Sequence, residues 1–482
     1  MYFREVASGL RGGSLRPRLR GVMGGVPRLR GSGRLSCNLS LSAGRFGWLP
    51  LALGLHVVVA VGYGRALPLF DWPDEVAHFN NIRHLAEQGR LDVMREQAWD
   101  PARLEALKRD HFRSLTGAED PAAAGLRYQA WQPPLYYAAA AAVYRLTRSV
   151  DALRGLSLLF SCLALGLAHA TLRAVFPDRA RIADAGVLFM ALHPMRACMA
   201  VSIGNDPAAE ALWALGLWLI VTRRPAGWVG LAAGAGLLTK VHLGALIPVY
   251  AAWRILDPAR GPTLRERGAG AARAAGIAAG LCLLAAAPWL TRNMRMYGWT
   301  DPLALGAGAL GSAPAEIAAL GRARPSLAWT GPHGLPEFFR ILSVSWWGVY
   351  GWMSIWPPCA VQGLYAALTA VPLAGAGFAL GRRARDASPA GAPVPAAAWL
   401  IALTPLIFLA ALLVYSRTDF QPQGRYLWVA GPAWGMLFAL GWDALPRPAR
   451  PLAIGGSLLL MALINAHAVG ALIPWYLSPG IP

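Results

Sequence analysis

Long apolar segments recur along almost the whole chain, and they constrain the fold more than any other feature of the sequence. They lie at 46–69, 134–147, 152–174, 182–202, 206–222, 226–239, 241–255, 271–290, 360–381, 396–416, 425–443 and 451–474. A helix of about 20 apolar residues crosses the hydrocarbon core of a bilayer. The sequence therefore predicts an all-α, polytopic integral membrane protein.

The composition agrees with this class. Of the 482 residues 56% are hydrophobic and only 15% are charged, whereas a soluble domain carries roughly 25% charged residues. The formal net charge of +20 would suit a nucleic-acid partner, but much of the excess is arginine in the first 45 residues and in short loops. Arginine is expected there in cytoplasmic segments. We therefore expect the partner to be the membrane and no nucleic acid.

The basic segments also predict the orientation. Residues 1–45 are rich in Arg, Gly and Ser, so we expect a disordered N-terminus that is retained in the cytoplasm. The basic loops can all be cytoplasmic only if 134–147 does not span, and that short helix reaches only about 21 Å. We expect it to dip into the membrane and return. These loops lie at 173–181, 223–224, 254–273, 382–385 and 447–450.

The predicted protein has about eleven spans in a bacterial inner membrane. A single membrane domain covers 46–482, with external loops at 70–131 and 291–357. The first loop shows helical periodicity, and we expect two helices at the membrane surface near 74–89 and 100–112.

An acidic motif opens the first external loop. It reads Asp71-Trp72-Pro73-Asp74-Glu75 and is followed by His78 and Asn81. A proline followed by acids is typical of a helix start, and that is one interpretation. The other is chemical, because Asp74, His78 and Asn81 would share one helical face. Such a face can hold a general base or a metal ion.

A second motif, Gln132-Pro133-Pro134-Leu135-Tyr136-Tyr137, carries a family resemblance. An Asp-Glu-x-x-His motif after the first span, followed by Pro-Pro-Leu-Tyr-Tyr, resembles the GT-C glycosyltransferases. These include the protein O-mannosyltransferases and the lipid A aminoarabinose transferases. It looks closer still to a bacterial membrane family catalogued as a domain of unknown function. Further short motifs in the expected order extend the resemblance over about 46–440, at 152–157, 204–207, 238–240, 292–298, 347–351 and 423–426. Relatives often carry a charged residue, His or Glu before the two prolines, whereas this chain has Trp131 and Gln132 there.

The resemblance implies an enzyme that moves a hexose or pentose from a polyprenyl-phosphate donor to a lipid or glycan acceptor. Transfer would occur at the outer face with inversion of the anomeric centre. Asp74 would be the base, with Asp71 as its substitute, and Glu75 and His78 would orient it or hold a divalent metal. The lipid phosphate would bind Arg148, Arg154, Lys240, Arg292 or Arg425, and the substrate would contact His78, Gln132, Tyr136 and Trp347.

Several alternatives stay open at this point. Asn205-Asp206-Pro207 reads more readily as a helix cap than as a site. The aromatic cluster at 346–352 suits an interfacial belt as well as a sugar platform. A transporter or flippase for lipid-linked glycans would show inverted repeats and broken helices, and we see neither clearly. An O-antigen polymerase or ligase would typically carry an Arg-rich external loop late in the chain.

Overall fold

The computed structural model describes residues 47–94, 100–306, 327–385, 396–417 and 419–478. The predicted disordered segment 1–45 lies outside these residues. The described part is all-α, as expected. Its only β-type pairs are two isolated bridges.

Six helical segments within the described residues are long and apolar enough to cross a membrane. They are α1 (Leu49–Ala66), α6 (Val150–Val175), α12 (Leu264–Tyr297), α16 (Cys359–Arg385), α17 (Ala396–Ser416), and α19 (Arg450–His467) continued through a π-helical turn into α20 (Ile473–Tyr476). Shorter helices pack among them, so the count of eleven spans stays a prediction. These are α7 (Ala180–Leu192), α8 (Pro194–Met199), α9 (Asp206–Val221), α10 (Ala226–Leu237), η1 (Val241–Ala245), α11 (Leu246–Leu256), α15 (Leu335–Gly348), η3 (Gly424–Ala430) and α18 (Gly431–Ala444).

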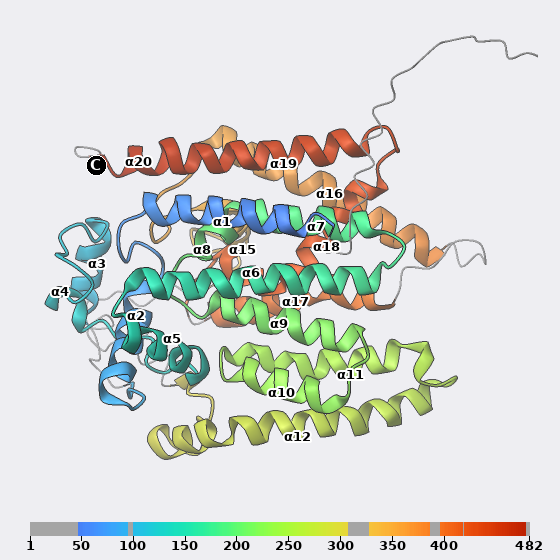
Figure 1. Cartoon of the computed structure of the whole chain (residues 1–482), viewed down its shortest axis with the longest axis horizontal. Coiled ribbons are helices and arrows are strands. Elements are labelled where there is room, and N and C mark those ends of the chain that lie inside the picture. Colours follow the sequence, from blue (N-terminus) through green and yellow to red (C-terminus); the bar gives the residue numbers. More distant parts are fainter. Residues whose placement is uncertain (1–46, 95–99, 307–326, 386–395, 418, 479–482) are drawn as a thin grey trace, which may run out of the picture. The chain divides into compact units, whose positions relative to one another are not determined.

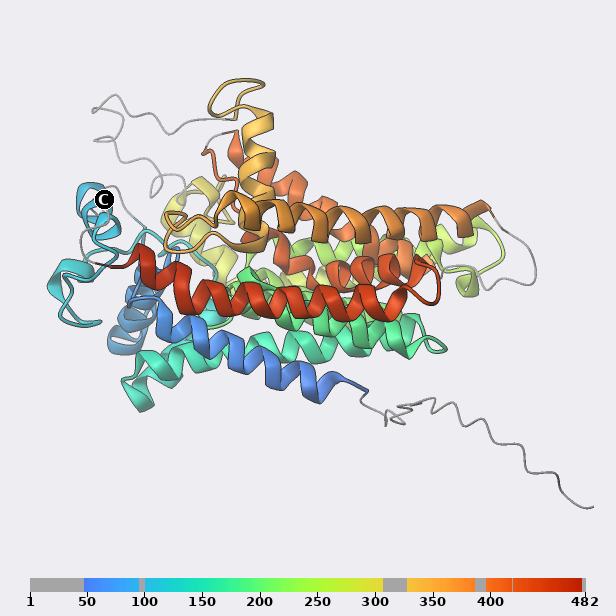
Figure 2. The same ribbon diagram turned by 90° about the horizontal axis from the view of Figure 1, so that it is seen from above.

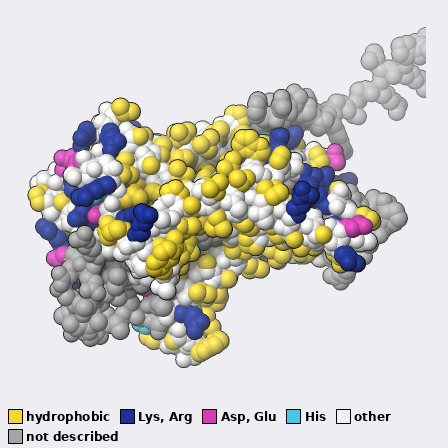
Figure 3. All heavy atoms as spheres, turned by 90° about the horizontal axis from the view of Figure 1, so that it is seen from below, with side chains coloured by type: hydrophobic (Ala, Val, Ile, Leu, Met, Phe, Trp, Pro, Cys, Tyr) yellow, Lys and Arg dark blue, Asp and Glu magenta, His cyan; other side chains and the backbone are white. Residues whose placement is uncertain are grey.

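The long helices run side by side (Figures 1 and 2). Figure 3 shows hydrophobic side chains over the middle of one face, with Lys and Arg gathered toward both ends. Val58, Leu284 and Val414 are each at least 67% exposed. Apolar patches of this extent are rarely left to water, and they mark a surface that lipid covers. The prediction of a membrane protein is confirmed.

A layer of short helices lies at one end of the bundle (Figure 1). It contains α2 (Glu75–Gln88), α3 (Pro101–Arg109), α4 (Pro121–Ala124) and α5 (Pro134–Thr147). The first two match the surface helices predicted for the first loop. Tyr137 and Tyr144 of α5 pack on His78 and Phe79 of α2. The segment 134–147 therefore belongs to this layer, in agreement with the expectation that it does not span.

Ion pairs gather the predicted cytoplasmic loops at the opposite end. Arg181 donates to Asp443 at 2.7 Å, and Arg223 forms a two-pronged pair with Asp257 at 2.9 Å. α20 instead lies at the end that carries α2–α4 (Figures 1 and 2). The described basic loops therefore share one end, and the acidic loop occupies the other. Which end is cytoplasmic stays a prediction.

The apolar segment 182–202 is divided into two helices. α7 ends at Leu192 and α8 begins at Pro194. Proline lacks an N–H and disfavours a helical conformation in the residue before it. His193 is accordingly extended, with φ −67° and ψ 121°. The break leads through an irregular stretch to the start of α9.

The orientation can be tested with two engineered cysteines, after the five native ones are changed to serine. Ala106 in α3 and Arg224 after α9 are both exposed and lie at opposite ends of the bundle. We expect Ala106→Cys to react with a membrane-impermeant maleimide in intact spheroplasts. Arg224→Cys should react only after the membrane is permeabilised. The reverse pattern would invert the predicted topology.

Candidate active site

The ends of four elements converge beneath the first loop and bring together charged side chains that lie far apart in the sequence. The elements are the starts of α2, α9 and η3 and the end of α10. The side chains that meet there are Asp74, His78, Asp206, Lys240 and Arg425. We refer to this group as the carboxylate–cation cluster.

Hydrogen bonds between backbone and amide groups hold these ends in place. The Leu135 N–H donates to the Leu238 carbonyl at 2.8 Å and ties α5 to α10. The Asn205 amide donates to the Thr239 carbonyl at 3.0 Å and to Gln132 Oε1 at 3.2 Å. Gln132, predicted to contact substrate, thus forms part of the frame around the cluster.

Asp74 is turned away from the helix that it precedes. It adopts a left-handed conformation, with φ 68° and ψ −2°, and its side chain makes no capping bond to α2. Such a conformation is uncommon for residues other than glycine, although Asp and Asn tolerate it. The carboxylate instead accepts a hydrogen bond from Arg425 Nη2 at 2.5 Å. A simple helix start does not explain this arrangement.

The charges around Asp74 keep it ionised. Burial by itself raises the pKa of Asp74, but the Arg425 guanidinium outweighs burial, and the pKa lies below its usual value. Burial lowers the pKa of His78 to about 4, although Asp74 and Asp206 oppose the shift. His78 is therefore neutral at pH 7, and its Nδ1 lies 2.6 Å from the Tyr137 hydroxyl.

Asp206 shares the two cations of the cluster. It pairs with Lys240, and its second oxygen lies 3.6 Å from Arg425 Nη1. Asn205 takes the N-cap position of α9, as the cap interpretation predicts, but its side chain makes no cap bond to the helix. The sequence indicated Lys240 as a candidate ligand of the lipid phosphate, but it did not show that Asp206 is its partner.

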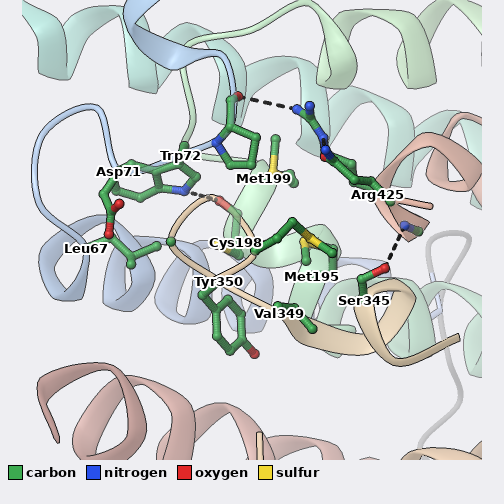
Figure 4. Close-up of a pocket in the computed structure, with 15 residues that line it drawn as sticks. Leu67, Asp71, Trp72, Met195, Cys198, Met199, Ser345, Val349, Tyr350 and Arg425 are labelled. Carbon is green, nitrogen blue, oxygen red and sulfur yellow. Dashed lines mark hydrogen bonds between the residues drawn. The ribbon is translucent and has the colours of Figure 1, made fainter. Parts of the chain in front are cut away.

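A close backbone approach fixes the position of Arg425. A Cβ atom on Gly424 would lie 2.3 Å from the backbone nitrogen of Trp346, so only glycine fits there. The Gly424 N–H donates to Ser345 Oγ at 2.9 Å, and Arg425 Nη1 donates to the Pro73 carbonyl at 3.4 Å (Figure 4). These contacts lock the start of η3 against the acidic motif.

Glu75 has a different environment from Asp74, although the two are adjacent. Its side chain is fully buried and accepts two hydrogen bonds from Arg154, at 3.0 and 2.9 Å. It also accepts from the backbone N–H groups of Phe70 and Ile203, each at 3.0 Å. Both carboxylate oxygens are thus occupied, and Arg154 is held away from the carboxylate–cation cluster, over the Trp72 ring.

Asp71 is also fully buried, but in other surroundings. One carboxylate oxygen lies 3.0 Å from His111 Nδ1, and among the described residues the other has no hydrogen-bond partner. Burial raises the pKa of Asp71, despite the contact with His111. In Figure 4 its carboxylate points away from Arg425. The two candidate bases, Asp71 and Asp74, therefore lie in different surroundings, which shift their pKa values in opposite directions.

The remaining predicted residues are not gathered at the cluster. Arg148 is exposed and pairs with Glu87, and Arg292 donates to the carbonyl of Asp92. Trp347 is 1% exposed and stacks on His193 and Tyr365 in the core, so neither an aromatic belt nor an exposed sugar platform describes it. Tyr136 is 2% exposed and lies in the buried face of α5.

The side chains present do not fit a resident metal ion. Within the described residues no three His, Cys, Asp or Glu side chains gather as metal ligands. Glu75, predicted as a ligand, has both oxygens bound to protein donors. Asp74 and Asp206 already pair with two cations. A divalent metal stays a prediction.

No protein-family model matches the sequence, and no curated protein matches it. Solved structures do match its fold. ArnT from Cupriavidus metallidurans, bound to undecaprenyl phosphate, superposes with a TM-score of 0.52 at 17% identity, over 87% of this chain and 64% of that chain. The chain has the GT-C fold. The predicted fold is confirmed.

Two further structures come from the oligosaccharyltransferase of Archaeoglobus fulgidus. A complex with Zn and sulfate has a TM-score of 0.47 at 12% identity, over 88% of this chain and 52% of that chain. A complex of the oligosaccharyltransferase AglB from this organism with an inhibitory peptide and a dolichol-phosphate has a TM-score of 0.46 at 12% identity, over 89% of this chain and 56% of that chain. This GT-C chain thus spans between about half and two thirds of the length of the structures that it matches.

Proposed function

We propose that the chain is a membrane glycosyltransferase. It transfers a hexose or pentose from a polyprenyl-phosphate donor to an acceptor hydroxyl at the outer, periplasmic face, with inversion. The carboxylate–cation cluster is the main support, because it combines an ionised carboxylate with two cations in a partly buried site. The fold of a protein solved with undecaprenyl phosphate adds weight to a lipid-linked donor.

The reaction follows from these groups. The acceptor oxygen attacks the anomeric carbon and gives its proton to Asp74. The bond from that carbon to the phosphate oxygen breaks, and the polyprenyl phosphate leaves with the electron pair. Lys240 and Arg425 stabilise the charge that develops on this leaving group. Arg425 then has less hold on Asp74, so Asp74 becomes a stronger base as the phosphate gains charge.

Loss of the sugar from its lipid tests the proposal directly. The full-length protein is purified in nanodiscs, and the lipid-linked sugar that co-purifies is identified by mass spectrometry. With that donor and an acceptor, we expect sugar-free polyprenyl phosphate to accumulate. A transporter or flippase would return the donor intact. A polymerase or ligase would consume a lipid-linked glycan and leave the single-sugar donor unchanged.

Lys240→Met should weaken binding of the donor phosphate. Removal of one partner from a desolvated charged contact costs roughly 2–5 kcal/mol. We expect a loss of affinity of this size for undecaprenyl phosphate in a nanodisc binding assay. Arg292→Met serves as the control, because Arg292 binds the Asp92 carbonyl outside the cluster. Unchanged affinity in Lys240→Met would remove this residue from the phosphate site.

A further inference from the structure

Asp206 makes contacts that a phosphate group would also make. Its two oxygens face Lys240 and Arg425, the two cations of the cluster. Its side chain is 17% exposed, whereas those of Lys240 and Arg425 are 12% and 6% exposed. In the described part of the chain, Lys240 pairs with no other carboxylate. A donor phosphate that reached Lys240 would therefore meet Asp206 already bound there.

We propose that Asp206 occupies the position of the donor phosphate in the empty site, and that the donor binds by exchange with this carboxylate. This inference rests on the proposed function and narrows its substrate class. The exchanged group carries one negative charge, which matches a sugar joined to its lipid through a single phosphate. A pyrophosphate linkage does not match.

The charge balance of the cluster supports exchange. Asp74 and Asp206 carry two negative charges, and Lys240 and Arg425 carry two positive ones. A phosphodiester that simply joined this group would add an uncompensated negative charge in a partly buried place, and such charges are costly. Departure of the Asp206 carboxylate restores the balance. A pyrophosphate would still leave one charge in excess.

A small hollow lies beside Asp206. Asp206 and Pro207 line a hollow together with Arg196, Glu210 and Trp428. The Asp206 carboxylate has only its two cationic partners among the described side chains. Glu75 provides the contrast, because its side chain is fully buried and accepts four hydrogen bonds. A carboxylate held like Glu75 is structural, whereas Asp206 is held only by the groups that a phosphate would bind.

The test measures binding of two probes to the full-length protein in nanodiscs. One is the methyl ester of undecaprenyl phosphate, a phosphodiester with a single charge, and the other is the corresponding methyl ester of undecaprenyl pyrophosphate, which carries one charge more. We expect the parent protein to prefer the phosphodiester. Asp206→Asn removes the competing charge and keeps the shape of the side chain. It should bind the phosphodiester about tenfold more tightly or better, a change of about 1.4 kcal/mol, and should keep the preference over the pyrophosphate, whose extra charge stays uncompensated.

Two controls separate exchange from a general charge effect. Asp443→Asn removes the same charge at the opposite end of the bundle and should leave affinity for the phosphodiester unchanged. In the double variant Asp206→Asn/Lys240→Met the gain should disappear. Equal or weaker binding by folded Asp206→Asn would overturn the exchange while the proposed function stands. If Asp206→Asn does not fold, a parent protein that binds the pyrophosphate more tightly than the phosphodiester would overturn the exchange. Absence of binding of either probe to the folded parent would overturn both proposals.

Discussion

Asp74→Asn should lower turnover by about 10²–10⁴-fold, the usual contribution of a positioned general base. Asparagine keeps the size of the side chain, tolerates the left-handed backbone at this position and can still contact Arg425. We therefore expect normal expression and retained donor binding. Single-turnover measurements with the co-purifying donor would place the loss in the chemical step.

Asp71→Asn is the matched control for this prediction. Asp71 lies in the same acidic motif, but it contacts His111 and points away from Arg425. Its loss should reduce turnover far less. Parent-like turnover in Asp74→Asn would exclude Asp74 as the base, and the helix-start interpretation predicts that result, with only a few tenths of a kcal/mol lost from stability. Abolished turnover in Asp71→Asn alone would assign the base to the other carboxylate of the loop.

Arg154→Met should destabilise the protein by about 3–5 kcal/mol, because it leaves the buried Glu75 carboxylate without its cation. Thermal or denaturant unfolding in detergent would measure the loss. The double variant Glu75→Gln/Arg154→Met should recover much of it, since no buried charge then remains. This expectation replaces a role for Arg154 in phosphate binding.

Arg148→Met gives the comparison for an exposed pair. Arg148 and Glu87 have side-chain exposures of 57% and 39%, and such pairs contribute about 1 kcal/mol or less. We expect its unfolding to match that of the parent closely. If Arg154→Met also unfolded like the parent, the Glu75–Arg154 pair would not anchor the first loop. A direct role for Arg154 at the donor would then regain support.

The sequence predicted the elements of this fold better than the contacts between them. Long apolar segments indicate a bilayer whatever their neighbours, so the sequence could place the long helices and the layer formed by the first loop. The acidic motif marked Asp74 as a candidate because its residues are consecutive. The pairing of Asp206 with Lys240 depends on where α9 begins and α10 ends in space, and no local pattern carries that information. The sequence also left the place of Trp347 open, because an aromatic cluster has the same pattern in a buried core and at a membrane interface.

The contact of Asp74 with Arg425 joins residues 351 positions apart, which has a consequence for biosynthesis. Membrane helices enter the bilayer in the order of synthesis, so Asp74 is in place long before η3 leaves the ribosome. The first loop can pack on α5 early, because both come from neighbouring sequence. A nascent chain, or one truncated before Gly424, therefore holds the carboxylate without its guanidinium partner. On the proposed function such a chain cannot yet transfer sugar, so activity appears only near the completion of translation.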